Sequence, residues 1–571
     1  MTESEYYPLL IPLAPLAAAL LTALPRGLVG ERSYRLGVLC HVAALAVSVQ
    51  VLRVAAEPGR PASDLLLFNP PLSDPLRFVF HLDRLAAVMM VVIAGIGTLI
   101  YLYSLRYMRQ ESGRARYHTL LALTVSVLLC MVSSGNLLLL FLCWQLLSWL
   151  LSFLAYNHVH PPTARGAFRT FAMLRVGDVA FLSGIILAYS LYGTLDLQEL
   201  FARAARTQDT FSFWQGGPEL RGSTVVTLLI FIGAMSKSAQ VPLHMWLPDS
   251  LYAPTPVHAL LHAGIINAGG FLINRLAPLF GLSSTTLHLA FLIGTLTAVL
   301  GAAMMLAQND IKKTLGFSTI GQMGYMIMEC GLGAFALAVF HLIAHGLFKA
   351  TVFLNCGNVI HKARQEPHFP HVDHQGEEPR LSRLTWFTGS VTTLFIPLLI
   401  LLVTHGVLRI PLLESQGTVI FLFFIWITSS QAILTLTRLR QVASWKVSAA
   451  MLSTLLFIVF VYLFAVESFT EFLYPNPEEV AFYFKAAHLP GWLFDIIIVT
   501  ATVLTVTGWS YLYMTAHGMA LRMPAWVDNV RIRLYLPFMN RLYADELYGL
   551  LGQMFMRLVH QLDKRERGWS R

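Results

Sequence analysis

The chain has 571 residues and a net charge of +9; 56% of its residues are hydrophobic and 12% are charged. Its mean hydropathy of +0.62 is far above that of a globular domain of this size. This composition excludes a soluble globular protein and predicts an integral membrane protein. Basic residues concentrate in loops and in the C-terminal "DKRERGWSR", as membrane topology and anionic lipid favour, and no nucleic-acid-binding module is visible.

Apolar segments long enough to cross a bilayer as helices, about 17 to 25 residues each, recur from the N-terminus to about residue 516. Their number, about fourteen or fifteen, predicts an all-α polytopic membrane protein. Glu3 and Glu5 precede the first segment and no small-residue cleavage site follows it, so a retained span is predicted and not a signal peptide. The predicted spans cover residues 7–25, 36–55, 84–105, 117–134, 136–156, 167–192, 223–250 (interrupted), 256–279, 286–306, 314–333, 335–361, 383–405, 416–436, 447–466 and 491–516.

Two further patterns concern the loops and the cysteines. Before the third span, "LLLFNPPLSDPLRFVFHLD" mixes β-forming residues with prolines and a turn, which predicts a short extracytoplasmic hairpin. The five cysteines lie inside or beside apolar segments without paired spacing. Neither a disulfide framework nor a zinc ribbon is therefore expected.

The seventh span, "TLLIFIGAMSKSAQVPLHMWLPDS", carries Lys237 and two prolines, Pro242 and Pro248. Proline removes a backbone donor and clashes with the preceding turn, so the helix is expected to break there. Broken helices at membrane depth occur where protein or a water-filled cavity satisfies the freed backbone, as in transporter sites. The next span begins with His258 and His262, four residues apart on one face.

The eleventh span contains "FHLIAHGLFKA", which places His341, His345 and Lys349 four residues apart on one stripe of a helix. Ionisable groups inside a membrane are costly and mark ion or proton paths. Histidine exchanges protons near neutral pH, and four helical residues rise about 6 Å, a distance that one water can bridge. This stripe predicts a proton wire.

Other polar groups allow more than one interpretation. Asp178 lies three residues after Arg175, so it either forms a local ion pair or pairs with Lys237. Lys312 lies at a span end, where a lysine can simply extend to the interface. In the loop "HFPHVDH", three histidines have ligand chemistry at close spacing and form a weak metal candidate, although loop histidines are usually solvated. These are His368, His371 and His374.

Three motifs, "SKSAQVPLHMWLPDSLYAPTPVHALLHAG", "QNDIKKTLGFSTIGQMGYM" and "FHLIAHGLFKATVFLNCGNVI", resemble the antiporter-like subunits of respiratory complex I and of multisubunit Na+/H+ antiporters. The resemblance covers roughly residues 60–400. It implies two inverted five-helix repeats, with a broken helix in the first and in the second. The implied division is N-terminal transmembrane helices and hairpin (1–115), first repeat (116–279), second repeat (280–440), C-terminal transmembrane helices (441–516) and an amphipathic tail (517–571). The implied proton or cation path, carried over position by position, consists of Asp178, Lys237, His262, Lys312, His341, His345 and Lys349.

Two positions depart from the family pattern. The family has a Trp-Glu pair whose glutamate partners the lysine of the seventh span, whereas here Trp144 is followed by the neutral Gln145. The twelfth span, 383–405, contains no acid or lysine and only His405. The residues after 516 are too few for the long lateral helix of the largest such complex I subunit. These departures argue against a complete complex I pumping path.

Within this family, "LLHAGIINAGGFLINRLAPLF" and "MECGLGAFALAVFHLIAH" are similar to the DabB subunits of energy-coupled inorganic carbon transporters. That resemblance implies a large peripheral partner, a DabA-like zinc protein similar to β-carbonic anhydrases. H+ or Na+ flow through the membrane subunit would drive hydration of CO2 to bicarbonate in the partner. Zinc and chemistry would belong to the partner, with no cofactor in this chain, and the location would be a bacterial inner membrane.

Three alternatives remain open at this point. The chain is a proton-pumping subunit of complex I or a related hydrogenase, a subunit of a Na+/H+ antiporter, or a membrane anchor that has lost transport. Gln145 and the uncharged twelfth span favour the anchor. The gene neighbourhood separates the first two from a carbon transporter.

Overall fold

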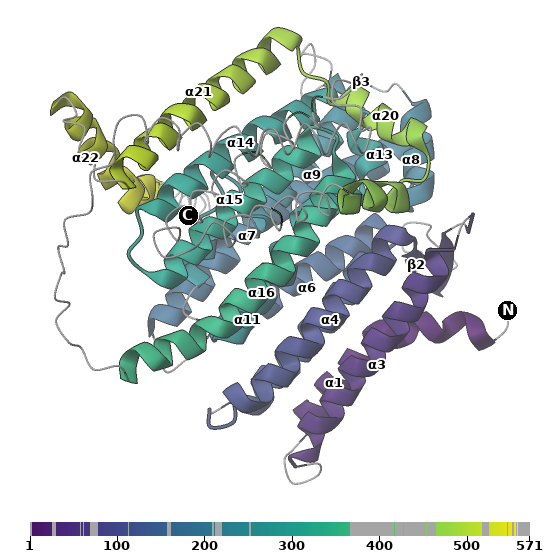
Figure 1. Ribbon diagram of the computed structural model, residues 1–571. Helices are drawn as coiled ribbons and strands as arrows, with labels where there is room; N and C mark the ends of the chain where they lie inside the picture. Colours follow the sequence, from purple (N-terminus) through teal and green to yellow (C-terminus); the bar gives the residue numbers. More distant parts are fainter. Residues whose placement is uncertain are drawn as a thin grey trace, which may run out of the picture.

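The computed structural model shows a bundle of long helices that run side by side, with two short β-hairpins (Figure 1). In the described part of the chain, ten helices are long and apolar enough to cross a membrane. The predicted fold class, an all-α polytopic membrane protein, is confirmed. The structure describes residues 3–24, 30–57, 59–60, 62–68, 78–111, 113–156, 161–207, 210–211, 220–250, 253–365, 464–516 and 525–544, and isolated positions at 416–453 and 546–557.

The helix bounds follow the apolar segments to within a few residues. In the first half they are η1 (Glu3–Leu9), α1 (Leu10–Ala23), α3 (Arg32–Ala55), α4 (Arg84–Tyr107), α5 (Arg114–Val132), α6 (Leu137–Ala155), α7 (Pro161–Tyr192), α8 (Leu197–Arg206) and α9 (Gly222–Lys237). They continue with α10 (Trp246–Asp249), α11 (Thr255–Leu260), η4 (Leu261–Ile265), α12 (Ala268–Arg275), α13 (Ala277–Phe280), α14 (Ser284–Leu306), α15 (Ile311–Gly331), α16 (Phe335–Gln365), α20 (Pro477–Ala486), α21 (Gly491–Ala516), α22 (Ala525–Met539) and η5 (Arg541–Tyr543).

Some predicted features cannot be compared with these bounds. The predicted spans 383–405, 416–436 and 447–466 lie outside the described residues, apart from isolated positions and the start of the helical stretch 464–473. The loop histidines His368, His371 and His374 also lie outside them. The two inverted repeats therefore stay a prediction.

The predicted hairpin forms strands β1 (Ser63–Phe68) and β2 (Phe78–Leu82), which pair antiparallel with a register shift between Leu66 and Phe68. A second, very short pair joins β3 (Thr210–Phe211) to β4 (Leu220–Arg221). The β1–β2 hairpin lies directly before α4, and we call the end of the bundle that carries it the hairpin end.

Polar side chains start several of the long helices. Asp83 accepts a hydrogen bond from the backbone of Ala86 at 2.8 Å and begins α4. Asn136 and Asp310 cap α6 and α15 in the same way. Each side chain satisfies a backbone N–H that has no partner within its helix, which fixes where the apolar segment begins.

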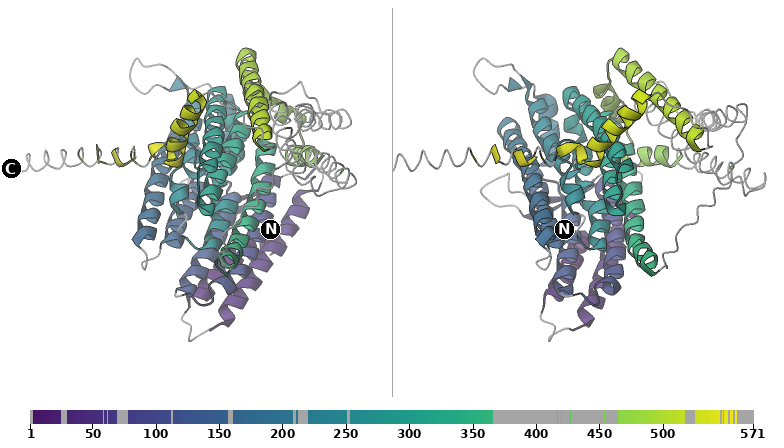
Figure 2. Two further views of the ribbon diagram at one scale, coloured as in Figure 1. Left: turned by 60° about the vertical axis from the view of Figure 1, so that its left-hand side comes forward. Right: turned by 90° about the vertical axis from the view of Figure 1, so that its left-hand side faces the viewer.

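Helices α14 and α15 pack backbone to backbone. A Cβ on Gly294 would lie 2.4 Å from the backbone nitrogen of Met328, and one on Gly324 would lie 2.4 Å from that of Ala298. Small residues allow such close approach, which is how membrane helices gain van der Waals contact in the absence of water. Figure 2 shows α21 on the outside of the bundle, where apolar contacts join it to α14 and α15.

Candidate ion path

Asp178, on α7, is held by groups from its own helix and from α6. It accepts a hydrogen bond from Trp144 Nε1 at 2.7 Å and forms an ion pair with Arg175 Nη2 at 2.7 Å. Arg175 also donates to Gln145 Oε1. Of the two pairings that the sequence left open for Asp178, the structure has the local one with Arg175. The neutral Gln145 still contributes, because its amide oxygen binds the same arginine.

Lys237, the last residue of α9, is fully buried. Its Nζ donates to the Trp144 carbonyl oxygen at 3.0 Å and to Ser148 Oγ at 2.6 Å, and lies 4.8 Å from the Trp144 ring centroid. A cation over an indole face gains electrostatic attraction that burial strengthens. Trp144 therefore touches both ions, Asp178 through its indole N–H and Lys237 through its carbonyl and ring.

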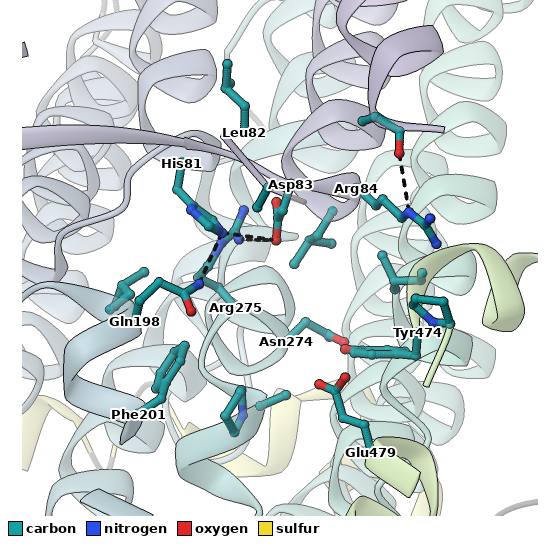
Figure 3. Close-up of a pocket in the computed structure, with 18 of the residues that line it drawn as sticks. His81, Leu82, Asp83, Arg84, Gln198, Phe201, Asn274, Arg275, Tyr474 and Glu479 are labelled. Atoms are coloured by element: carbon teal, nitrogen blue, oxygen red, sulfur yellow. Dashed lines mark hydrogen bonds and ion pairs between the residues drawn. The ribbon is translucent and has the colours of Figure 1, made fainter. Parts of the chain in front are cut away.

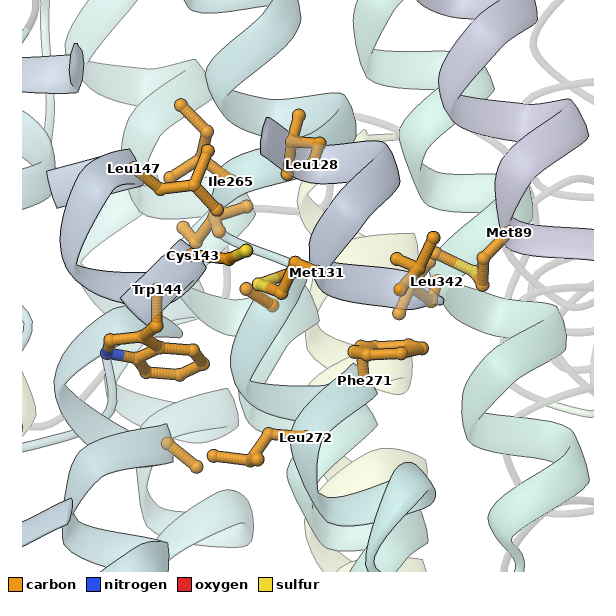
Figure 4. Packing of buried hydrophobic residues seen from close by; sticks show 14 of the residues in the cluster. Met89, Leu128, Met131, Cys143, Trp144, Leu147, Ile265, Phe271, Leu272 and Leu342 are labelled. Atoms are coloured by element: carbon orange, nitrogen blue, oxygen red, sulfur yellow. The ribbon is translucent and has the colours of Figure 1, made fainter. Parts of the chain in front are cut away.

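The surroundings of Trp144 are apolar. Figure 4 shows Cys143, Leu147 and Ile265 among the side chains that pack near Trp144, in the same buried cluster as Leu272 of α12. Removing a charge from water costs several kcal/mol unless partners compensate. The hydrogen bonds to Lys237 and Asp178 are therefore what permits two charged groups at this depth.

The helix that carries Lys237 breaks immediately after it. The chain is non-helical from 238 to 245, and this stretch contains Pro242, whereas Pro248 lies inside the short α10, where a first-turn proline loses no hydrogen bond. Ser238 Oγ donates to the Ile266 carbonyl at 2.6 Å. A Cβ on Gly269 would lie 2.4 Å from Ser238 Oγ, so the break packs directly against α12.

His262 lies in η4, a π-helical segment that the sequence did not reveal. Single π-helical turns inside α-helices are rare and frequent at functional sites. The His262 ring is fully buried and stacks on Phe353 of α16 at a centroid distance of 4.4 Å, while His258 lies 5.7 Å from the same ring. Both histidines thus lie against α16, His258 from α11 and His262 from the π turn.

The predicted stripe of His341, His345 and Lys349 lies along α16. The two imidazole centroids are 6.3 Å apart. Lys349 Nζ donates to Ser318 Oγ of α15 at 2.9 Å. A Cβ on Gly346 would lie 3.2 Å from the Ala263 carbonyl oxygen, so α16 also packs closely on η4. The structure therefore places His262 beside α16, the helix that carries the stripe, although the two lie far apart in the sequence.

Two residues beside the stripe were missed from the sequence. Both carboxylate oxygens of Glu329, on α15, lie 3.1 Å from His341 Nδ1. Gln322 Oε1 lies 2.9 Å from His341 Nε2. Glu329 is a single acid within an apolar span, and that signal was visible in "YMIMECGLGAF".

Lys312 lies apart from the rest of the predicted path. It occupies the first turn of α15, at the opposite end of that helix from Glu329, and is half-buried. Lys349 also approaches the carbonyl of Leu315, one turn beyond Lys312, at 3.4 Å. The position of Lys312 fits the end of a path that continues past Lys349 toward the face opposite the hairpin.

The spacing of the buried groups suits proton transfer through water. The ring nitrogens of His262 and His345 are buried and have no hydrogen-bond partner within the described part of the protein. Buried polar atoms are usually satisfied by protein or by ordered water. Gaps of about 6 Å between imidazoles can be bridged by one water each. The arrangement can therefore pass protons between groups that accept and release them.

A separate polar pocket of about 530 Å³ opens at the hairpin end (Figure 3). In it, Arg275 Nη1 pairs with Asp83 Oδ2 at 2.7 Å and His81 Nε2 lies 3.9 Å from the same oxygen. Burial raises the pKa of Asp83, but Arg275 and His81 outweigh burial, and the pKa lies below its ordinary value. This ion pair joins the start of α4 to the end of α12.

Fold and site together define a polytopic membrane protein with a broken helix beside a buried lysine and a second row of ionisable groups, features that recur in membrane transport proteins. Residues 134–435 match the family model "NADH:quinone oxidoreductase/Mrp antiporter, TM", and residues 73–118 match "NADH-Ubiquinone oxidoreductase (complex I), chain 5 N-terminus". The chain belongs to this NADH:quinone oxidoreductase/Mrp antiporter family.

Relatives differ in how much of their length the chain covers. A probable inorganic carbon transporter subunit DabB1 of Halothiobacillus neapolitanus is 38% identical over 98% of this chain and 99% of its own length. NADH-quinone oxidoreductase subunit L of Neisseria meningitidis serogroup B is 34% identical, but the match covers 68% of this chain and 58% of that subunit. The chain thus spans little more than half of the complex I relative.

Solved structures confirm the fold. The Mrp complex from Dietzia sp. DQ12-45-1b contains a chain that superposes with a TM-score of 0.57 at 23% identity, over 96% of this chain and 60% of that one. The archaeal membrane-bound sulfane sulfur reductase contains one with a TM-score of 0.55 at 17% identity, over 90% of this chain and 97% of that one. The chain is an antiporter-like membrane subunit related to those of complex I and Mrp complexes.

Proposed function

We propose that this chain is the cation-conducting membrane subunit of an energy-coupled inorganic carbon uptake complex in a bacterial inner membrane. One observation carries the proposal: the similarity to DabB1 extends over 98% of this chain and 99% of that protein. The similarity to subunit L covers only 58% of that subunit. A DabA-like zinc protein would be the partner and would hydrate CO2 to bicarbonate.

The coupling ion that the site favours is the proton. Four central groups of the path, Lys237, His262, His345 and Lys349, offer nitrogen atoms. Lysine and histidine nitrogens bind and release protons, whereas hard cations prefer carboxylate, carbonyl and water oxygens. The carboxylates near the path are already engaged, Asp178 by Arg175 and Glu329 by His341. We therefore expect proton flow along the path to bias the partner's reaction.

The energy of one proton is sufficient for accumulation of bicarbonate. Moving one charge across 100 mV supplies about 2.3 kcal/mol. Because about 1.4 kcal/mol corresponds to a tenfold change in an equilibrium constant, one proton per turnover supports accumulation by roughly fiftyfold. Hydration of CO2 also releases a proton, which the partner must pass on.

The test is uptake of labelled inorganic carbon into cells that lack their own carbonic anhydrase and that express this chain with a DabA-like genetic neighbour. We expect accumulation that a protonophore abolishes. Assembly is checked by co-purification of the two proteins. An assembled complex without accumulation would contradict the proposal and favour a redox-linked pump or a Na+/H+ antiporter subunit.

A further inference from the structure

The stripe on α16 has a direction, and one of its ends lies near the hairpin end of the bundle. Asp83, at the start of α4, pairs with Arg275 at the last residue of α12, so α12 ends at the hairpin end. Asn274 Nδ2 lies 3.5 Å from Cys330 Sγ, so α15 ends there as well. The short loop 332–334 then leads into α16. His341 is therefore the member of the stripe closest to the hairpin end.

Glu329 lies beyond His341 in the same direction. It is the third residue from the end of α15, whereas His341 is the seventh residue of α16, and each helical residue rises about 1.5 Å. Both residues of this pair are partly exposed, with side-chain exposures of 12% for Glu329 and 16% for His341, whereas His345 and Lys349 are buried. By its place on the helix, the carboxylate lies on the hairpin-end side of His341.

The hairpin end is assigned to the extracytoplasmic side by the charges of the loops. The connection between α4 and α5, at the opposite end, contains or adjoins Arg106, Arg109, Arg114 and Arg116. The connection between α1 and α3, at the same end as the α4–α5 connection, adds Arg26, Arg32 and Arg35. At the hairpin end, the loops 133–136, 281–283 and 332–334 contain no lysine or arginine, and the longer connections 56–83 and 193–221 carry their arginines at lower density. Short cytoplasmic loops carry the excess of basic residues. Glu329 therefore faces the outside of the cell.

We propose that Glu329 is the extracytoplasmic terminal group of the proton path, which takes protons from water at the hairpin end and passes them to His341. The inference rests on the proposed function and names the group at which its path begins. The Glu329 carboxylate accepts a proton from external water and gives it to His341 Nδ1, and the imidazolium then releases one proton toward His345. Glu329 returns to the carboxylate, and His341 is left with its hydrogen on Nδ1; a ring flip or proton exchange with water restores the starting tautomer, so one proton moves and none is consumed.

The titratable neighbours of Glu329 are few among the described residues. His341 and His345 face this region from α16, and Cys330 is adjacent on α15. Asn274 of α12 is the neutral group that contacts Cys330 and also lines the polar pocket of Figure 3. Asn274 thus joins the pocket to the end of α15 that carries Glu329.

The experiment compares proton flux through the purified two-protein complex in liposomes that contain a pH-sensitive dye, with the pH varied on one side at a time. Glu329→Gln keeps an oxygen that accepts from His341 but cannot carry a proton. We expect it to lower the flux at least about tenfold, as loss of a proton-transfer group does. Glu329→Asp carries protons with a shorter reach, and we expect it to keep about a third of the flux. Glu57→Gln, at an exposed pair with Arg60, is the matched control and should equal the wild type.

The outcomes separate a relay from a structural role. In Glu329→Asp, the pH of half-maximal flux should shift when the pH on the hairpin side is varied and stay constant when the other side is varied. Wild-type flux in Glu329→Gln, or equal loss in both variants of an assembled complex, would overturn the inference. Carbon uptake by the wild type tests the proposed function separately. A failure of the proposed function is therefore distinguished from a failure of the role assigned to Glu329.

Discussion

At the level of single residues, the path depends on a few charged groups that the fold holds in apolar surroundings. Lys237 is bound by neutral oxygens of Trp144 and Ser148, and Lys349 donates to Ser318. Lysine nitrogens bind and release protons, which is the property that a relay requires.

Alanine at either path lysine should abolish carbon uptake. Lys237→Ala and Lys349→Ala each remove a proton-carrying nitrogen from the path, so we expect uptake to fall at least about tenfold while the complex stays assembled. Lys485→Ala, on the exposed surface of α20, is the control and should leave uptake unchanged. The readout is labelled carbon accumulation together with co-purification; full uptake in both path variants would contradict the assignment.

The Asp83–Arg275 pair makes stability depend on pH. The pKa of Asp83 lies below its ordinary value, so the carboxylate stabilises the folded state above the ordinary value of about 3.9, and this contribution is lost as the pH falls through the lower folded value. We expect Asp83→Asn to cost about 3 kcal/mol at neutral pH, since it leaves a buried arginine unpaired.

Thermal unfolding in detergent between pH 3 and pH 7 measures this difference. The apparent Tm of Asp83→Asn should be lower than that of the wild type at pH 7, and the two should converge toward pH 3. Glu57→Gln, at a surface pair, should match the wild type throughout. A constant difference across this range would show that charge at Asp83 is not the cause.

At the level of elements, backbone contact between α14 and α15 positions the helix that carries Glu329 and Ser318. Gly324→Ala would bring a Cβ to 2.4 Å from the backbone of Ala298, which cannot move aside as a side chain can. We expect a loss of about 1 to 3 kcal/mol, typical of overpacking, and a lower apparent Tm. Gly95→Ala on α4 is the control, because its Cβ would meet only Leu45 at 3.8 Å.

The broken helix and the π turn are the two irregular elements, and both adjoin the path. The break after Lys237 and η4 around His262 meet where Ser238 bonds to Ile266. Pro242 and the flanking polar residues made the break predictable. The π turn was not predictable, because its apolar sequence resembles ordinary helix.

At the level of the whole molecule, the ion requirement of carbon uptake shows whether H+ or Na+ is the coupling ion. We expect the assembled complex to accumulate carbon equally well in Na+-free medium, and to lose accumulation when a protonophore is added. The nitrogen-rich path is the reason. Uptake that requires Na+ and resists the protonophore, measured in the same cells, would contradict the proton path.

The sequence by itself determined the membrane class, the bounds of the described long helices to within a few residues, and the stripe of His341, His345 and Lys349, because hydropathy and helical spacing are local properties of the chain. Only the tertiary structure decided the partners: Asp178 with Arg175 and Trp144, and Glu329 with His341. All three contacts join side chains on different helices or on adjacent turns of one helix, and their rotamers depend on packing. A single acid in an apolar segment, such as Glu329, is visible in the sequence. Its proposed role follows only from the antiparallel packing of α15 and α16, which places its carboxylate 3.1 Å from the His341 imidazole. Distance is the reason, because it decides whether a proton can pass.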